Sequence, residues 1–79
     1  MNIRLKLFAT LQRFHGGGLA GTPFHVDLAE GAALAVLVSV LGLPDDEVKI
    51  CFVNGLIRDS QYVLSDNDDV GIFPPVGGG

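Results

Sequence analysis

Apolar and polar residues alternate with a period of two in the first part of the chain. The alternation runs through residues 1–8 and again through residues 24–28, which follow Pro23. Such a period is typical of a strand that buries one face. We therefore predict two strands, joined by a helical turn over residues 9–14 and a glycine-rich loop over residues 16–21. The side chains that these strands bury are Ile3, Leu5, Leu7, Phe24, Val26 and Leu28.

A helix is predicted over residues 32–41. Its apolar positions at helical spacing are Leu34, Leu37, Val38 and Leu41. Gly42 suits the left-handed position after a helix, and Pro44 prevents its continuation. The opposite side carries Ala33, Val36 and Val40. Two interpretations stay open: this side is an oligomer or partner surface, or small apolar side chains cover a modestly exposed face.

Three further strands are predicted in the second half of the chain. Residues 48–53 form a β-branched and aromatic run, and Asn54-Gly55 then predicts a tight hairpin turn with residues 56–58 as its return strand. We predict a loop over residues 59–69 and a last strand over residues 70–73. In this run we expect Val48, Ile50 and Phe52 to face the helix, and Lys49, Cys51 and Val53 to face away.

The order strand, strand, helix, strand, strand, strand predicts an α+β fold. We expect a mixed sheet of about five strands with one main helix across one face. If the first and last strands pair side by side, the fold is a ubiquitin-like β-grasp. The 79 residues are enough for one small domain, so we predict a single domain over residues 1–79 with a flexible tail over residues 76–79.

Composition narrows the classes of partner. The net charge of −4 argues against nucleic acid or an anionic membrane, both of which require clustered Lys and Arg. One cysteine, Cys51, and no recognisable targeting or membrane-spanning segment lead us to expect a cytoplasmic protein.

Motifs for autonomous catalysis are weak. Gly16-x-Gly18-x-x-Gly21 matches a dinucleotide-binding pattern, but a strand follows it where that pattern needs a helix. The run 66–69 begins like a calcium loop yet lacks the bidentate carboxylate, so a solvated turn is the better interpretation. His15, His25 and Cys51 do not have zinc spacing. We expect no metal or cofactor bound by this chain and no catalysis of its own.

The end of the chain is the strongest candidate site. Pro74-Pro75 stiffens the exit from the last strand, and Val76-Gly77-Gly78-Gly79 follows with no side chains beyond Val76. Such a tail is thin enough to enter a narrow channel and present its terminal carboxylate there. The alternative is an ordinary frayed end.

Four segments resemble the MoaD/ThiS family of small sulfur-carrier proteins, which have the β-grasp fold. They are residues 3–9, 53–55, 64–70 and 72–79. The Phe-Pro-Pro-Val ending with terminal glycines is most similar to the MoaD branch, the small subunit of molybdopterin synthase. Asn67 stands where the family's turn often has glycine, which Asn can replace because it tolerates positive φ.

The resemblance implies that Gly78 and Gly79 are the functional element. An adenylyltransferase similar to ubiquitin-activating enzymes would use ATP and magnesium to adenylate the Gly79 carboxylate. A sulfur donor protein would then convert it to a thiocarboxylate, which would supply sulfur to molybdopterin in the large subunit of molybdopterin synthase. Alternatives are sulfur transfer for thiamin, cysteine or tRNA, a ubiquitin-like protein modifier, and a non-catalytic β-grasp binding module.

A partner interface is also predicted beside the tail. Alternation places Phe8, Cys51, Val53 and Phe73 opposite the helix, near Arg4 and Lys6. Loops or neighbouring strands could cover them instead. The residues that we assign to this interface are Phe8, Val53, Phe73, Pro74, Pro75, Val76 and Gly77.

Overall fold

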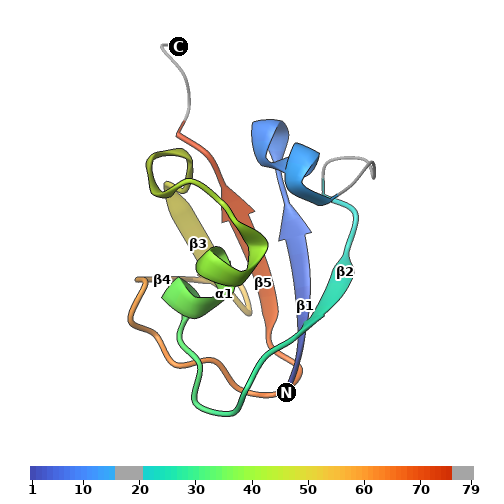
Figure 1. The fold of residues 1–79 in the computed structure, drawn as a ribbon, viewed down its shortest axis with the longest axis vertical. Helices are drawn as coiled ribbons and strands as arrows, with labels where there is room; N and C mark the ends of the chain where they lie inside the picture. Colours follow the sequence, from blue (N-terminus) through green and yellow to red (C-terminus); the bar gives the residue numbers. More distant parts are fainter. Residues whose placement is uncertain (16–20, 76–79) are drawn as a thin grey trace.

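The computed structural model of the protein describes residues 1–15 and 21–75 (Figure 1). Its elements, in chain order, are β1 (Asn2–Leu7), the 3₁₀ helix η1 (Ala9–His15), β2 (Phe24–Asp27), α1 (Leu34–Leu41), the 3₁₀ helix η2 (Asp45–Glu47), β3 (Ile50–Val53), β4 (Leu56–Arg58) and β5 (Asp69–Phe73). No helix in the described ranges is long and apolar enough to cross a membrane.

All five strands form one mixed sheet in the order β2-β1-β5-β3-β4. The central pair, β1 and β5, is parallel, with Leu5 opposite Val70 and Leu7 opposite Ile72. The other strand pairs are antiparallel. Figure 1 shows α1 lying across one face of this sheet. The predicted β-grasp arrangement is therefore confirmed, because the first and last strands do pair side by side.

The sheet has a covered face toward α1 and an open face away from it. Burial alternates along β1 and β5 as the sequence predicts, with Ile3, Leu5, Val70 and Ile72 fully buried. Arg4, Lys6 and Gly71 alternate with these side chains and belong to the open face. The core of the described residues thus lies between this central parallel pair and the helix.

In β3 the predicted assignment of faces is wrong. Cys51 and Val53 are buried, whereas Ile50 is 37% exposed and Phe52 is partly exposed. The pairing with β5 explains this phase, because Cys51 lies opposite buried Ile72 and Val53 lies opposite buried Val70. Residues directly opposite each other in a sheet share a face. Val53 therefore belongs to the core, and its assignment to a partner interface on the open face is not supported.

Helix α1 starts two residues later than predicted and ends where predicted. Gly42 adopts φ 72°, and its N–H donates to the carbonyl of Ser39. At the other end, the N–H groups of Leu34 and Ala35 donate to the carbonyls of Tyr62 and Ser60, at 3.0 and 2.9 Å. The segment after β4, predicted only as a loop, thus satisfies two donors that a helix start leaves unpaired. On the outer side of α1, Val36 and Val40 are 44% and 60% exposed.

Asp68 ties the β3–β4 turn to the start of β5. Its side chain is only 6% exposed and accepts hydrogen bonds from Asn54 Nδ2 at 2.9 Å and from the Ser65 N–H at 2.8 Å. The Asp69 N–H in turn donates to Asn54 Oδ1 at 3.0 Å. The run 66–69 is therefore not simply a solvated turn, as predicted, because Asp68 is buried and hydrogen-bonded within the protein.

The backbone at both turns confirms the sequence-based expectations. Asn54 and Gly55 have φ of 53° and 85°, as the predicted Asn-Gly hairpin requires. Asn67 has φ 69°, which is the left-handed conformation expected of a residue that replaces glycine.

We expect Asp68→Ala to lower the free energy of unfolding by about 2 kcal/mol or more, because it leaves the Ser65 N–H and the Asn54 amide without their acceptor. For a domain of this size that corresponds to a fall of roughly 10 °C in melting temperature. Thermal and urea unfolding followed by circular dichroism measure both quantities. The matched control is Asp46→Ala, an exposed carboxylate, with an expected effect within about 0.5 kcal/mol. Equal effects of the two substitutions would contradict a structural role for Asp68.

Candidate functional site

The last described residues leave the sheet at one end of β5. The carbonyl of Phe73 accepts a hydrogen bond from the Lys49 N–H at 2.9 Å. Pro74 and Pro75 have no N–H and cannot continue the ladder. Pro74 is partly buried and Pro75 is exposed. The predicted site residues Val76, Gly77, Gly78 and Gly79 lie outside the described residues.

Three aromatic rings form a patch on the open face beside this exit. We call Phe8, Phe52 and Phe73 the aromatic patch. The rings of Phe8 and Phe73 are stacked, with centroids 4.2 Å apart and an angle of 3° between their planes. Phe52 meets Phe73 edge-on, at 5.6 Å and 77°. All three rings remain partly exposed, so the patch is a preformed apolar surface and not a buried core.

Two glycines make room for the Phe8 ring. A Cβ atom at Gly71 would lie 3.3 Å from Phe8 Cε2, and one at Gly21 would lie 3.1 Å from Phe8 Cε1. Both distances are shorter than ordinary van der Waals contact, so a side chain at either position would push the ring away from its place. Gly21 also has φ 79° and donates its N–H to the Leu7 carbonyl at 2.8 Å. Glycine in a strand often marks such a close approach.

A shallow hollow of about 450 Å³ lies over the aromatic patch and extends to Lys6 and Asp69. Beyond it, Arg4 Nη1 lies 2.9 Å from Asp69 Oδ2, and both side chains are 41% exposed. An ion pair this exposed contributes little stability. The ion pair does place fixed polar groups at the end of the open face where β5 begins. The apolar end of the open face lies where β5 leaves the sheet. This division is typical of an interface with an apolar centre and a polar rim.

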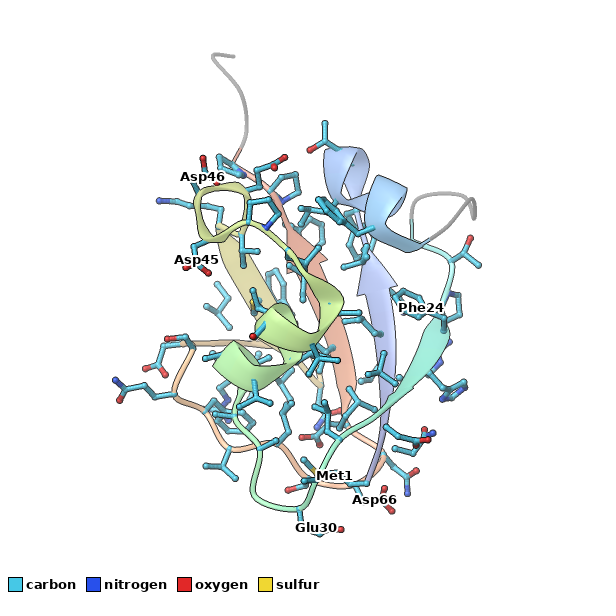
Figure 2. All side chains as sticks on the ribbon, in the orientation of Figure 1. Met1, Phe24, Glu30, Asp45, Asp46 and Asp66 are labelled. Atoms are coloured by element: carbon cyan, nitrogen blue, oxygen red, sulfur yellow. The ribbon has the colours of Figure 1, made fainter. Side chains whose placement is uncertain are left out.

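Acidic residues border the exit on another side. Helix η2 (Asp45–Glu47) precedes Lys49, which pairs with Phe73, so its carboxylates lie at the end of the sheet where β5 leaves it (Figure 2). Asp45 and Asp46 are both exposed. A partner that receives the segment after Pro75 would therefore meet negative charge on this side of the exit.

The structure brings together only some of the predicted interface residues. Phe8, Phe73 and Pro74 lie at the apolar end of the open face or directly after β5, as expected. Phe52 and Gly71 belong to the same surface, although the sequence-based interpretation placed Phe52 in the core and gave Gly71 no role. The missed signal was Gly71 itself, because a glycine in the middle of a strand often indicates that another group packs closely against the backbone.

Cys51 lies on the covered face, and its predicted placement opposite the helix is wrong. It is 8% exposed and borders a hollow of about 440 Å³ between α1 and the β3–β4 hairpin. Burial raises the pKa of its thiol above the ordinary value, since desolvation penalises the thiolate. The nucleophilic form of cysteine is therefore suppressed at neutral pH. Within the described ranges, no three His, Cys, Asp or Glu side chains lie together in a group that could hold a metal ion.

One mixed sheet with its first and last strands paired in parallel and one helix across one face defines a small protein of the ubiquitin-like β-grasp class. Comparison with family models is more specific. The chain belongs to the ThiS family, whose model matches residues 5–79. A comparison with curated proteins found no match.

Similar solved structures include proteins from three organisms. A putative molybdopterin converting factor subunit 1 from Pyrococcus furiosus is 24% identical, with 96% of this chain and 99% of that chain covered and a TM-score of 0.76. SAMP1 from Haloferax volcanii is 23% identical, with full coverage of both chains and a TM-score of 0.74. A chain in the complex of subunits 1 and 2 of the Helicobacter pylori molybdopterin-converting factor is 20% identical, with full coverage of both chains and a TM-score of 0.64. At these identities the likeness establishes the ubiquitin-like β-grasp fold.

We expect native Cys51 to react with iodoacetamide at neutral pH at least about tenfold more slowly than the same residue in denatured protein, because its thiol is buried and protonated. The folded-state pKa lies above the unfolded-state value, so thiolate formation favours unfolding only in alkaline solution. Mass spectrometry of timed reactions measures both rates. Equal rates in native and denatured protein would make Cys51 a candidate carrier of sulfur in its own right.

Proposed function

We propose that this protein is a sulfur carrier whose Gly79 carboxylate is activated and thiocarboxylated by partner enzymes. The observation that carries the proposal is the match to the ThiS family model, which extends through residue 79 and so includes the terminal glycines. The properties of Cys51 add support, because this buried and protonated thiol is poorly suited to carry sulfur in its place.

The chemistry of the proposed activation follows from the carboxylate. A carboxylate is a poor electrophile, whereas an acyl-adenylate has AMP as a good leaving group. An adenylyltransferase similar to ubiquitin-activating enzymes would use ATP and magnesium for this step. A persulfide on a sulfur donor protein would then displace AMP and give an acyl disulfide. A second thiol of the donor would cleave its S–S bond, which leaves a thiocarboxylate on Gly79 and a disulfide on the donor. The glycines have no side chains that would block entry of this end into the partners' active sites.

We further propose that the sulfur acceptor is the pterin precursor of molybdopterin, bound to a large subunit. Support comes from the names of two structural relatives, one of which was solved as a complex of subunits 1 and 2 of a molybdopterin-converting factor. The aromatic patch is the surface best suited to such a subunit, because it lies beside the exit of β5 and is already ordered in the free chain. Thiamin, cysteine and tRNA pathways would use the same end group.

The second candidate is a ubiquitin-like modifier, in which the Gly79 carboxylate is joined to lysine side chains. The likeness to small archaeal modifier protein 1 from Haloferax volcanii favours keeping it, because that protein is named as a modifier and shares the fold with a TM-score of 0.73. Both candidates require adenylation at the same carboxylate. They differ in whether a sulfur or an amine displaces AMP, and this difference is visible in the mass of the product.

We expect the intact protein, incubated with its activating enzyme, ATP, magnesium and a sulfur donor, to gain the mass that corresponds to replacement of one oxygen by sulfur. Deletion of Gly79 should abolish the gain without changing the circular dichroism spectrum. Cys51→Ala, which keeps the tail, is the matched control and should gain sulfur normally. Sulfur uptake by the truncated protein would contradict the terminal-carboxylate mechanism, and isopeptide-linked adducts would identify a modifier instead.

We expect Phe73→Ala to weaken binding to the large subunit by about tenfold or more, because it removes the ring at the centre of the aromatic patch. Stability should fall by only about 1 kcal/mol, since the ring is partly exposed and its stacking contributes a similar amount. Calorimetric titration and thermal unfolding measure the two effects. Val40→Ala on the outer side of α1 is the control for loss of an exposed apolar side chain. A large fall in melting temperature with unchanged affinity would give Phe73 a core role.

A further inference from the structure

The turn between β3 and β4 carries a chemically reactive pair, Asn54-Gly55. In an Asn-Gly sequence the glycine backbone nitrogen can attack the asparagine Cγ, because glycine has no side chain to hinder it. A bond forms between Gly55 N and Asn54 Cγ, the Cγ–Nδ2 bond breaks, and ammonia leaves. Water then opens the resulting cyclic imide at either carbonyl, which gives aspartate or isoaspartate. The reaction requires no enzyme and no oxidant.

In the folded protein both polar atoms of the Asn54 side chain are held by residues 68 and 69. Nδ2 donates to Asp68 Oδ1 at 2.9 Å, and Oδ1 accepts from the Asp69 N–H at 3.0 Å. The Asn54 N–H also donates to the Asp69 carbonyl at 2.8 Å. The side chain is thus directed toward the start of β5. To reach the Gly55 nitrogen it must break both of its hydrogen bonds and rotate back over its own backbone.

The acceptor for Nδ2 is itself firmly held. Asp68 is 6% exposed, and its second oxygen accepts the Ser65 N–H at 2.8 Å. A carboxylate fixed from both sides cannot follow the amide if Asn54 rotates. The turn is open for this reaction when the Asn54 side chain has left both Asp68 and Asp69, and such local openings are less populated the more bonds they break.

We propose that Asn54 is a latent deamidation site, which its hydrogen bonds to Asp68 and Asp69 keep closed in the folded protein and which opening of the β3–β4 turn exposes. Conversion to aspartate replaces the Nδ2 donor with an oxygen that faces Asp68 Oδ1. The new negative charge repels the buried carboxylate and removes its donor, so the closed turn is destabilised. Isoaspartate also lengthens the backbone within a two-residue turn. Because neither product reverts to asparagine, either one shows that the turn has opened.

This site is distant from the exit of β5. Asp66, which accepts the Asn2 N–H at 2.7 Å, and Met1 lie at the opposite end of the molecule from Asp45 and Asp46 (Figure 2). The Asn54 turn lies at the same end as Asp66, since Asn54 pairs with residues 68 and 69. The modification would thus act on the fold and not directly on the tail, and it does not depend on the proposed function.

The test is a timed incubation of folded wild-type protein at mildly alkaline pH and 37 °C, alongside the same protein in concentrated urea. Peptide mapping measures the mass gain of amide-to-acid conversion at Asn54, and enzymatic methylation of isoaspartate gives an independent readout. We expect conversion in the folded protein to be slower by about tenfold or more, as the loss of two hydrogen bonds on opening requires. Asp68→Ala, folded by circular dichroism, should approach the rate in urea.

The matched control is Asp66→Ala. It removes a carboxylate that lies in the same loop but makes no hydrogen bond with Asn54, so this variant should keep the slow wild-type rate of deamidation. A folded Asp68→Ala protein no faster than wild type would overturn the proposal, as would equal wild-type rates with and without urea. If Asp68→Ala does not fold, the proposal is tested instead by the deamidation rate of wild-type protein at urea concentrations below the unfolding transition. A rise that follows the opening of the turn supports the proposal, and a flat rate overturns it.

Discussion

Parallel pairing of β1 with β5 is the constraint on which the open face depends. Leu7 lies opposite Ile72, and the Phe8 N–H donates to the Ile72 carbonyl at 3.2 Å, which sets Phe8 and Phe73 side by side. A shift of one residue would turn Ile72 outward and Phe73 into the core. Burial of an aliphatic side chain contributes about 1.5–3 kcal/mol, whereas an aromatic pair adds about 0.5–1.5 kcal/mol. Core burial therefore decides the register, and the aromatic stack follows from it.

Because of the same pairing, the two ends of the sheet carry different groups. At one end, Asp68 and Asn54 fasten the β3–β4 turn to the start of β5. At the other end, β5 leaves the sheet beside three partly exposed rings and a short acidic helix. The first end is fixed by side-chain hydrogen bonds, and the second presents an apolar surface suited to a partner. A sulfur carrier of the proposed kind would use this division, because its tail must reach into other proteins while the fold that presents it stays unchanged.

How much of this could be predicted depended on the contrast between the two faces of each strand. In β1, charged Arg4 and Lys6 oppose Ile3 and Leu5, so alternation alone assigned the faces correctly. In β3 both faces are apolar, and only the pairing of Cys51 with Ile72 decides which one is buried. Pairing between residues distant in sequence is not visible in local periodicity. That is why Val53 was assigned to the interface, Phe52 to the core, and buried Asp68 to a solvated turn.

The proposal that the tail is the functional element depended on a different kind of signal. The glycines after Pro75 have no periodicity and no side-chain chemistry. The stiff exit and the lack of side chains marked them as a candidate site, and the resemblance to a family whose model also matches this region supplied the proposed chemistry. The structure adds the setting from which that segment departs, with Phe73 as its last strand residue. It also adds a reason against the one alternative sulfur carrier in the chain, because Cys51 is buried and its thiol pKa is raised.

Fragmentation of the sulfur-loaded intact protein in a mass spectrometer tests most directly whether transferred sulfur resides on the carboxylate of Gly79. Each fragment reports whether the added mass lies before or after a given residue. If the protein is a sulfur carrier of the proposed kind, the added mass is found in every fragment that contains Gly79, down to the smallest. Added mass in fragments that contain Cys51 but end before Pro74 would contradict the mechanism.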